Sequence, residues 1–184
     1  MLAARVIGAS PDSTSQVLFI NRGSHDGIRR DMGVITPDGV VGKIIAVYAD
    51  TSQVLLVGDK ESGVGAMLAN SRTQGPVKGT GEPRLSLEYI SNDEKVTLGE
   101  QVLTSGQDRI FPKDLPVGTV SEVVPQPKTP FMRIRVTPAA HLDRLEEVLV
   151  LLSRQELTPK KEVDASTAPV IAPQATAQTP ARPR

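Results

Sequence analysis

The side chains best suited to acid–base chemistry in this chain are its two histidines, His25 and His141; cysteine is absent. A serine hydrolase needs a histidine that contacts a serine hydroxyl and is oriented by a carboxylate. Ser62 and Ser105 are the candidate nucleophiles for such chemistry. No Gly-x-Ser-x-Gly sequence, the mark of a nucleophile elbow, occurs in the chain. The residues around both serines are typical of turns between strands, which favours a chain without a catalytic site.

Phosphate and metal sites are not predicted either. The glycine pairs at 63–65 and 79–81 lack the third glycine and the following helix of a dinucleotide-binding loop. The carboxylate pairs at 93–94 and 146–147 are adjacent residues, which point apart or lie on a solvated face rather than converging on an ion. We therefore expect no catalytic residue, no cofactor and no metal.

Composition narrows the possible functions further. The 184 residues include 21 basic and 21 acidic side chains, so the net charge is zero. A nucleic-acid binder needs a basic face that neutralises phosphates, and base stacking needs aromatic side chains. Only five aromatic residues are present: Phe19, Tyr48, Tyr89, Phe111 and Phe131. These numbers argue against nucleic acid as a partner.

Most of the chain is predicted to form strands. Two β-branched runs, 34–36 and 40–47, flank a Pro-Asp-Gly turn and predict a hairpin. Residues 85–89 alternate with a period of two, so they are predicted to form a strand with one solvated face. This alternation places three side chains together on the other face: Leu85, Leu87 and Tyr89.

The folded part of the chain is expected to end in a short helix and a strand before residue 153. Residues 139–147 favour the helix, and the dense aliphatic run at 148–152 favours the strand. A single helix over 139–157 is the alternative. No stretch approaches the ~20 apolar residues of a membrane-spanning helix, and no signal peptide is recognised. A membrane anchor would therefore have to lie outside this chain.

An internal similarity suggests two related units. Residues 28–36 resemble 96–104, and 42–47 resemble 118–123, with an insertion near 106–113 in the second copy. The similarity predicts an all-β protein of two small barrels.

The predicted domains are a first barrel at 1–60, which can also take a strand from the C-terminal part, and a second barrel at 61–152. Residues 153–184 are rich in proline and alanine and are expected to be disordered, because they offer little apolar surface to bury.

The insertion carries apolar residues among prolines. Phe111 either fills the end of a barrel or is presented to a partner, and the buried position is the favoured one because aromatic residues are scarce here. For partner contacts, we nominate four residues as candidates: Phe111, Leu115, Phe131 and Met132.

Several motifs resemble the family of the rod-shape-determining protein MreC. They occur in the family's order across residues 6–152: the Asn-Arg-Gly-Ser-His-Asp-Gly-Ile at 21–28, the Pro-Asp-Gly-Val-Val-Gly-Lys at 37–43, the Leu-Pro-Val-Gly-Thr-Val at 115–120 and the Leu-Asp-Arg-Leu-Glu-Glu-Val at 142–148. Asp31 and Asp114 stand where the family usually has glycine. If these positions need a positive φ, aspartate tolerates it better than most residues.

The resemblance implies a trypsin-like pair of β-barrels without a catalytic triad, on the extracytoplasmic face of the inner membrane, with a single-pass anchor that this chain lacks. It implies a scaffold of cell-wall elongation that determines rod shape, self-associates into dimers or filaments, and binds the elongation transpeptidase, a penicillin-binding protein. MreD, RodA, RodZ and MreB are implied as further partners, through parts absent from this chain.

Two alternative functions remain open from the residues. One is a serine hydrolase on the same kind of barrel, with Ser62 or Ser105 as nucleophile and His25 or His141 as base. The other is a peptidoglycan-binding module.

Overall fold

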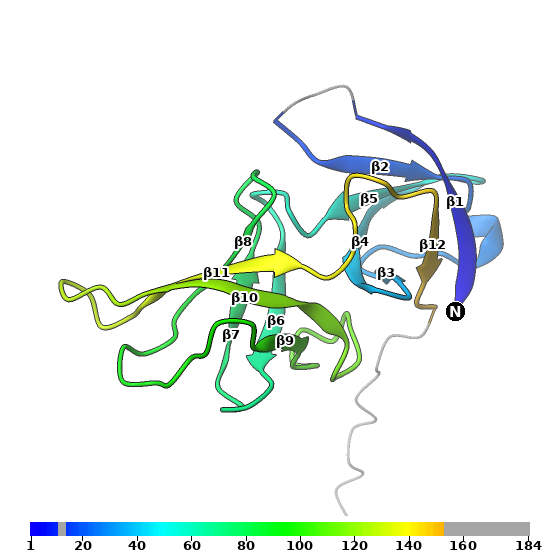
Figure 1. Cartoon of the computed structure of the whole chain (residues 1–184). Coiled ribbons are helices and arrows are strands. Elements are labelled where there is room, and N and C mark those ends of the chain that lie inside the picture. The colour runs from blue at the N-terminus through cyan, green and yellow to red at the C-terminus, as the bar shows by residue number, and fades with distance from the viewer. Residues whose placement is uncertain (11–13, 153–184) are drawn as a thin grey trace, which may run out of the picture.

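The computed structural model describes residues 1–10 and 14–152 and shows two closed antiparallel barrels of six strands each (Figure 1). The prediction of an all-β protein with two barrels is confirmed. The expected disorder of residues 153–184 lies outside the described residues. The strands are β1 (Leu2–Ala9), β2 (Val17–Ile20), β3 (Gly33–Thr36), β4 (Gly39–Val47), β5 (Ser52–Leu56), β6 (Gly63–Leu68), β7 (Gln74–Lys78), β8 (Leu85–Leu87), β9 (Gln101–Thr104), β10 (Pro116–Val124), β11 (Arg133–Pro138) and β12 (Glu147–Val150).

The first barrel has the strand order β1-β12-β3-β4-β5-β2, so its sixth strand comes from the C-terminal end of the described chain. β12 lies between β1 and β3, with Ala4 opposite Val148 and Ile35 opposite Leu149. The expected hairpin around Pro37 and Asp38 joins β3 to β4. The second barrel contains β6 to β11 in the order β10-β11-β8-β7-β6-β9.

The internal similarity is reproduced in the strand pairing. Val34 pairs with Gly42 in the first barrel, and Val102 pairs with Gly118 in the second. In both barrels a bulge lies directly before this glycine on the longer strand, at Val41 in β4 and at Val117 in β10. The repeated residues therefore form structurally equivalent hairpins that differ in the length of their connection.

Glycine at 42 and 118 is required by the same close approach in each barrel. A Cβ atom at Gly42 would collide with the carbonyl oxygen of Leu55, and one at Gly118 with that of Thr137. We expect Gly42→Ala and Gly118→Ala each to lower the free energy of unfolding by about 1–3 kcal/mol through overpacking. Chemical denaturation measures the loss. Gly8→Ala is the control, because a Cβ there meets no atom within 4 Å.

The two aspartates at glycine positions adopt the left-handed conformation. Asp31 has a φ of 61° and Asp114 a φ of 70°. Gly99, which corresponds to Asp31 in the second copy, has a φ of 79° and donates its N–H to the Val120 carbonyl, as Asp31 does to Ile44. The backbone shape is thus kept although the residue differs.

The predicted short helix at 139–147 is wrong, and so is the longer helical alternative over its described part. The segment is an irregular connection with one turn in which the Arg144 N–H donates to the His141 carbonyl. It links β11 of the second barrel to β12 of the first. Ala140 is buried in the core of the first barrel, and Leu142 packs against both cores. These contacts outweigh the helical preference of the local sequence.

The two barrels meet across a continuous apolar core. One buried cluster joins the interior of the second barrel to Ile35, Val40 and Val57 of the first. The insertion carries Phe111 into this junction, where its ring lies so close to Gly33 that a Cβ on that glycine would clash with it. Phe111 is thus buried, as favoured from the sequence, but it lies at the junction of the two barrels and not simply at the end of one.

Candidate partner-binding surface

The residues proposed for a hydrolase do not form a catalytic site. The His25 ring lies 3.0 Å from the Asp50 carboxylate on an exposed loop. Ser62 is buried, and its N–H donates to the Asp59 carbonyl in a turn. Within residues 1–10 and 14–152, no hydrogen bond joins His25 or His141 to the hydroxyl of Ser62 or Ser105. The geometry therefore gives no support to the hydrolase alternative.

Groups that could bind a metal are likewise not assembled in the part of the chain that the structure describes, where no three His, Asp or Glu side chains converge. In the same part, no helix is long and apolar enough to cross a membrane.

The four nominated contact residues lie in different environments. Phe111 and Met132 are buried at 2% and 6% exposure, which leaves them no surface for a partner. Leu115 is half-buried and packs on the core of the second barrel. Phe131 is exposed at 39%. Of the four, Phe131 alone has the accessible apolar surface that an anchor residue needs.

Phe131 has an aromatic neighbour that the sequence pattern placed wrongly. Tyr89 was expected to share the buried face with Leu85 and Leu87, but it is 59% exposed. β8 ends at Leu87, and Tyr89 adopts the left-handed conformation with a φ of 61°, which turns its side chain outward. Its ring meets that of Phe131 edge to face, with centroids 5.5 Å apart. We call Tyr89 and Phe131 the aromatic pair.

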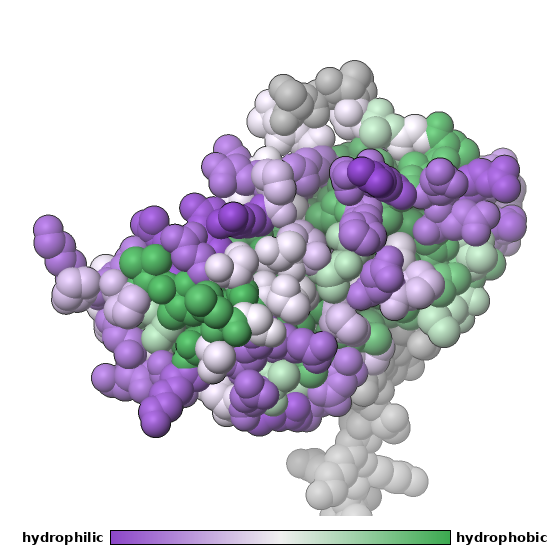
Figure 2. Space-filling model, in the orientation of Figure 1, coloured by the Kyte–Doolittle hydropathy of each residue, from purple (hydrophilic) through white to green (hydrophobic). Residues whose placement is uncertain are grey.

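The conformation of Tyr89 is unfavourable for a bulky side chain. A left-handed backbone costs an L-residue other than glycine about 1–2 kcal/mol. Strained residues persist only where the surrounding structure holds them in place. They are concentrated at functional sites. Figure 2 shows hydrophobic residues gathered on the surface of the second barrel, and Val124 at the end of β10 is a further exposed apolar residue there.

Asn92 holds together the two loops that carry the aromatic pair. Its side-chain amide donates to the carbonyls of Gln126 (3.1 Å) and Thr129 (2.6 Å), and its amide oxygen accepts from the Gln126 N–H. Thr129 in turn donates its hydroxyl to the carbonyl of Phe131. These bonds fix the β10–β11 loop against the segment that follows Tyr89.

We expect Asn92→Ala to lower the free energy of unfolding by about 1–2 kcal/mol, because several hydrogen bonds are lost together. Amide hydrogen exchange of residues 124–132 should become faster, while exchange in the first barrel stays unchanged. Asn70→Ala is the matched control, since the Asn70 side chain is exposed and forms no hydrogen bond among the described residues. Equal effects of both substitutions would contradict the role of Asn92.

Two closed six-stranded barrels joined by a shared apolar core define a double-barrel domain. Residues 6–152 match the family model described as "Rod shape-determining protein MreC, barrel core". The chain therefore belongs to the MreC family.

Similar proteins support this assignment. The chain is 34% identical over 172 residues to the cell shape-determining protein MreC of Cereibacter sphaeroides, covering 94% of this chain and 55% of that protein. It is 30% identical over 151 residues to MreC of Escherichia coli K12, and the match covers 82% of this chain and 41% of the Escherichia coli protein. The chain thus spans about half the length of the curated relatives it matches.

Solved structures share the fold. The crystal structure of MreC from Pseudomonas aeruginosa matches this chain with a TM-score of 0.79 and 30% sequence identity. The match covers 82% of this chain and 97% of the Pseudomonas chain. MreC of Helicobacter pylori, solved in complex with the penicillin-binding protein PBP2, has a TM-score of 0.66 at 18% identity, covering 82% and 96%. The latter likeness shows the common fold alone.

Proposed function

We propose that this chain is the extracytoplasmic barrel part of a scaffold for cell-wall elongation that determines rod shape and catalyses no reaction. Membership of the MreC family supports the assignment. The separation of both histidines from the candidate serines agrees with a non-catalytic role. Attachment to the inner membrane, self-association, and contacts with MreD, RodA, RodZ and MreB belong to the same proposal.

The partner proposed for the barrels is the elongation transpeptidase. Support comes from the Helicobacter pylori protein of the same fold, which forms a complex with a penicillin-binding protein. The observation that carries the proposal on this chain is the aromatic pair, exposed on the second barrel and held there despite the unfavourable backbone of Tyr89. Both barrels are closed, so the partner is expected to dock on side chains rather than to add a strand to a free edge.

Phe131→Asp tests the proposal, because a charge placed in an apolar contact must be desolvated on binding. We expect capture of the transpeptidase by the intact chain to fall at least tenfold, with the far-ultraviolet spectrum unchanged. Arg109→Asp is the control, because Arg109 lies on the insertion loop, where its neighbours Ile110 and Phe111 approach Gly33 of the first barrel. Undiminished capture by the Phe131 variant would remove this residue from the interface, and labelling of the wild-type chain by a fluorophosphonate probe would instead support the hydrolase.

A further inference from the structure

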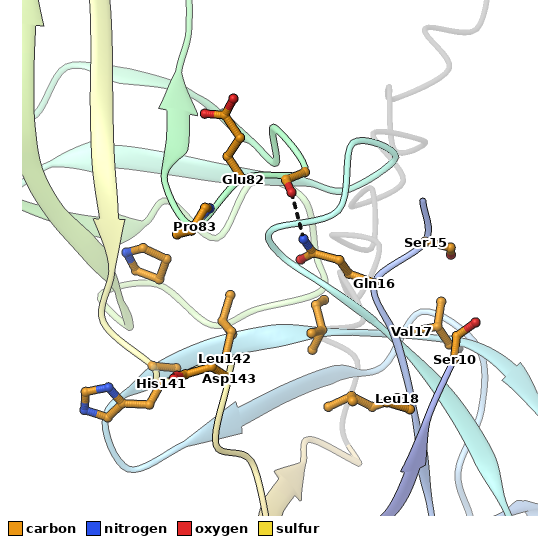
Figure 3. A pocket seen from close by; sticks show the side chains of 15 residues that line it. Ser10, Ser15, Gln16, Val17, Leu18, Glu82, Pro83, His141, Leu142 and Asp143 are labelled. Atoms are coloured by element: carbon orange, nitrogen blue, oxygen red, sulfur yellow. Dashed lines mark hydrogen bonds between the residues drawn. The ribbon is translucent and has the colours of Figure 1, made fainter. Parts of the chain in front are cut away.

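A groove of about 760 Å³ lies between the two barrels (Figure 3). Its size is within the range of ~300–1,000 Å³ that is typical of ligand sites. The Gln16 side chain borders it and donates to the Gly81 carbonyl at 3.2 Å, which ties the first barrel to the second. Apolar side chains from both barrels and from the connection between them line the groove: Val17, Leu18, Leu56, Pro83, Pro138 and Leu142.

The acidic side chains around the groove are largely paired with arginines: Glu82 with Arg135 at 3.5 Å, Asp143 with Arg144 at 3.4 Å and Glu147 with Arg5 at 4.0 Å. Glu82 and Asp143 lie on its border. A second hollow, of about 370 Å³, shares His141 with the groove and is lined by Asp38, Glu146 and Glu147 together with one arginine. An occupant that suits the apolar lining of the groove is an extended apolar segment without charge.

We propose that the groove binds residues 168–173 of this same chain, the sequence Ala-Pro-Val-Ile-Ala-Pro. The two prolines restrict the backbone of the segment, so less conformational entropy is lost on binding than for an ordinary peptide. Residues 165–181 contain no charged side chain, so the segment suits the apolar lining of the groove.

The connection has the length that the distance requires. Leu2, at one end of β1, pairs with Val150 near the end of the described chain, and Ala9, at the other end of β1, lines the groove. A strand of this length spans about 25 Å. The two places are joined by 15 residues, 153–167, and the general relation for a linker of this number of residues gives a root-mean-square length of roughly 21 Å. A linker whose length matches its span gives the highest effective concentration of the bound segment.

The chain lacks cysteine, so a single spin label can be attached to the intact protein. We place it on Ala175→Cys, just beyond the segment, and measure the intensities of the amide signals. We expect the amides of Val17, Leu18 and Leu142 to lose most of their intensity, while those of Tyr48 and Asp50 keep theirs. The substitutions Val170→Asp and Ile171→Asp, both within the proposed segment and after the last strand in the sequence, should restore the groove signals.

Three results would overturn this inference: unchanged groove signals, equal loss over the whole surface, or equal loss in the Asp variants. A mixture of spin-labelled chain with isotope-enriched, unlabelled chain distinguishes binding within one chain from binding between two copies. If the groove signals are weakened in that mixture as strongly as in the labelled chain itself, the groove binds a second copy instead. The inference does not depend on the proposed function, because no transpeptidase is present in the measurement.

Discussion

Replacing Phe111 by alanine is expected to lower the free energy of unfolding by about 3–5 kcal/mol. The ring is 2% exposed and belongs to the apolar cluster that spans both barrels. The ring packs directly against the Gly33 backbone, so truncation removes this contact as well as the buried apolar area. The cavity would therefore lie where the two barrels meet.

Urea denaturation measures this loss, with Phe131→Ala as the matched control. Phe131 is the same residue type on the same barrel but is exposed at 39%, so its truncation should cost much less. If Phe111→Ala were as mild as the control, Phe111 would have to be a surface residue available to partners, which is contrary to its position in the structure.

Replacing Tyr89 by glycine is expected to separate binding from stability. Glycine relieves about 1–2 kcal/mol of backbone strain. This gain offsets the loss of the edge-to-face contact with Phe131, about 0.5–1.5 kcal/mol. The free energy of unfolding should therefore change by less than about 1 kcal/mol. Transpeptidase affinity should fall by about 30-fold, which corresponds to the 2 kcal/mol typical of an anchor residue.

Tyr48→Ala provides the comparison for Tyr89→Gly. Tyr48 is 53% exposed on the first barrel and is expected to leave affinity unchanged. A large loss of stability in Tyr89→Gly, with affinity retained, would mean that the left-handed tyrosine serves the fold and not a partner.

The parts of the fold that depend on local sequence could be predicted. The Pro-Asp-Gly turn gave the β3–β4 hairpin because its residues favour the backbone angles that the turn needs. The repeat could be found because both hairpins require glycine where Gly42 and Gly118 meet a neighbouring carbonyl. These signals lie within a few residues of the structure they specify.

Features that depend on distant contacts could not be predicted from the same signals. The connection at 139–147 has a helical composition, but Ala140 and Leu142 pack against barrel cores. Those cores are formed by residues distant in the sequence, so local composition does not predict the contacts. Tyr89 fits the alternating pattern of residues 85–89, but β8 ends at Leu87 and Tyr89 itself adopts the left-handed conformation. Only Phe131 of the aromatic pair could therefore be predicted as a contact residue, because the alternating pattern assigns Tyr89 to the buried face.

The most direct test of the proposed scaffold is the dissociation constant between the intact chain and the extracytoplasmic region of the elongation transpeptidase. The wild-type chain is predicted to bind, and the double variant Tyr89→Gly/Phe131→Asp to bind at least tenfold more weakly with both barrels still folded. Equal dissociation constants for the two chains, or no binding by the wild type, would contradict the claim that the aromatic pair of the second barrel is the docking site.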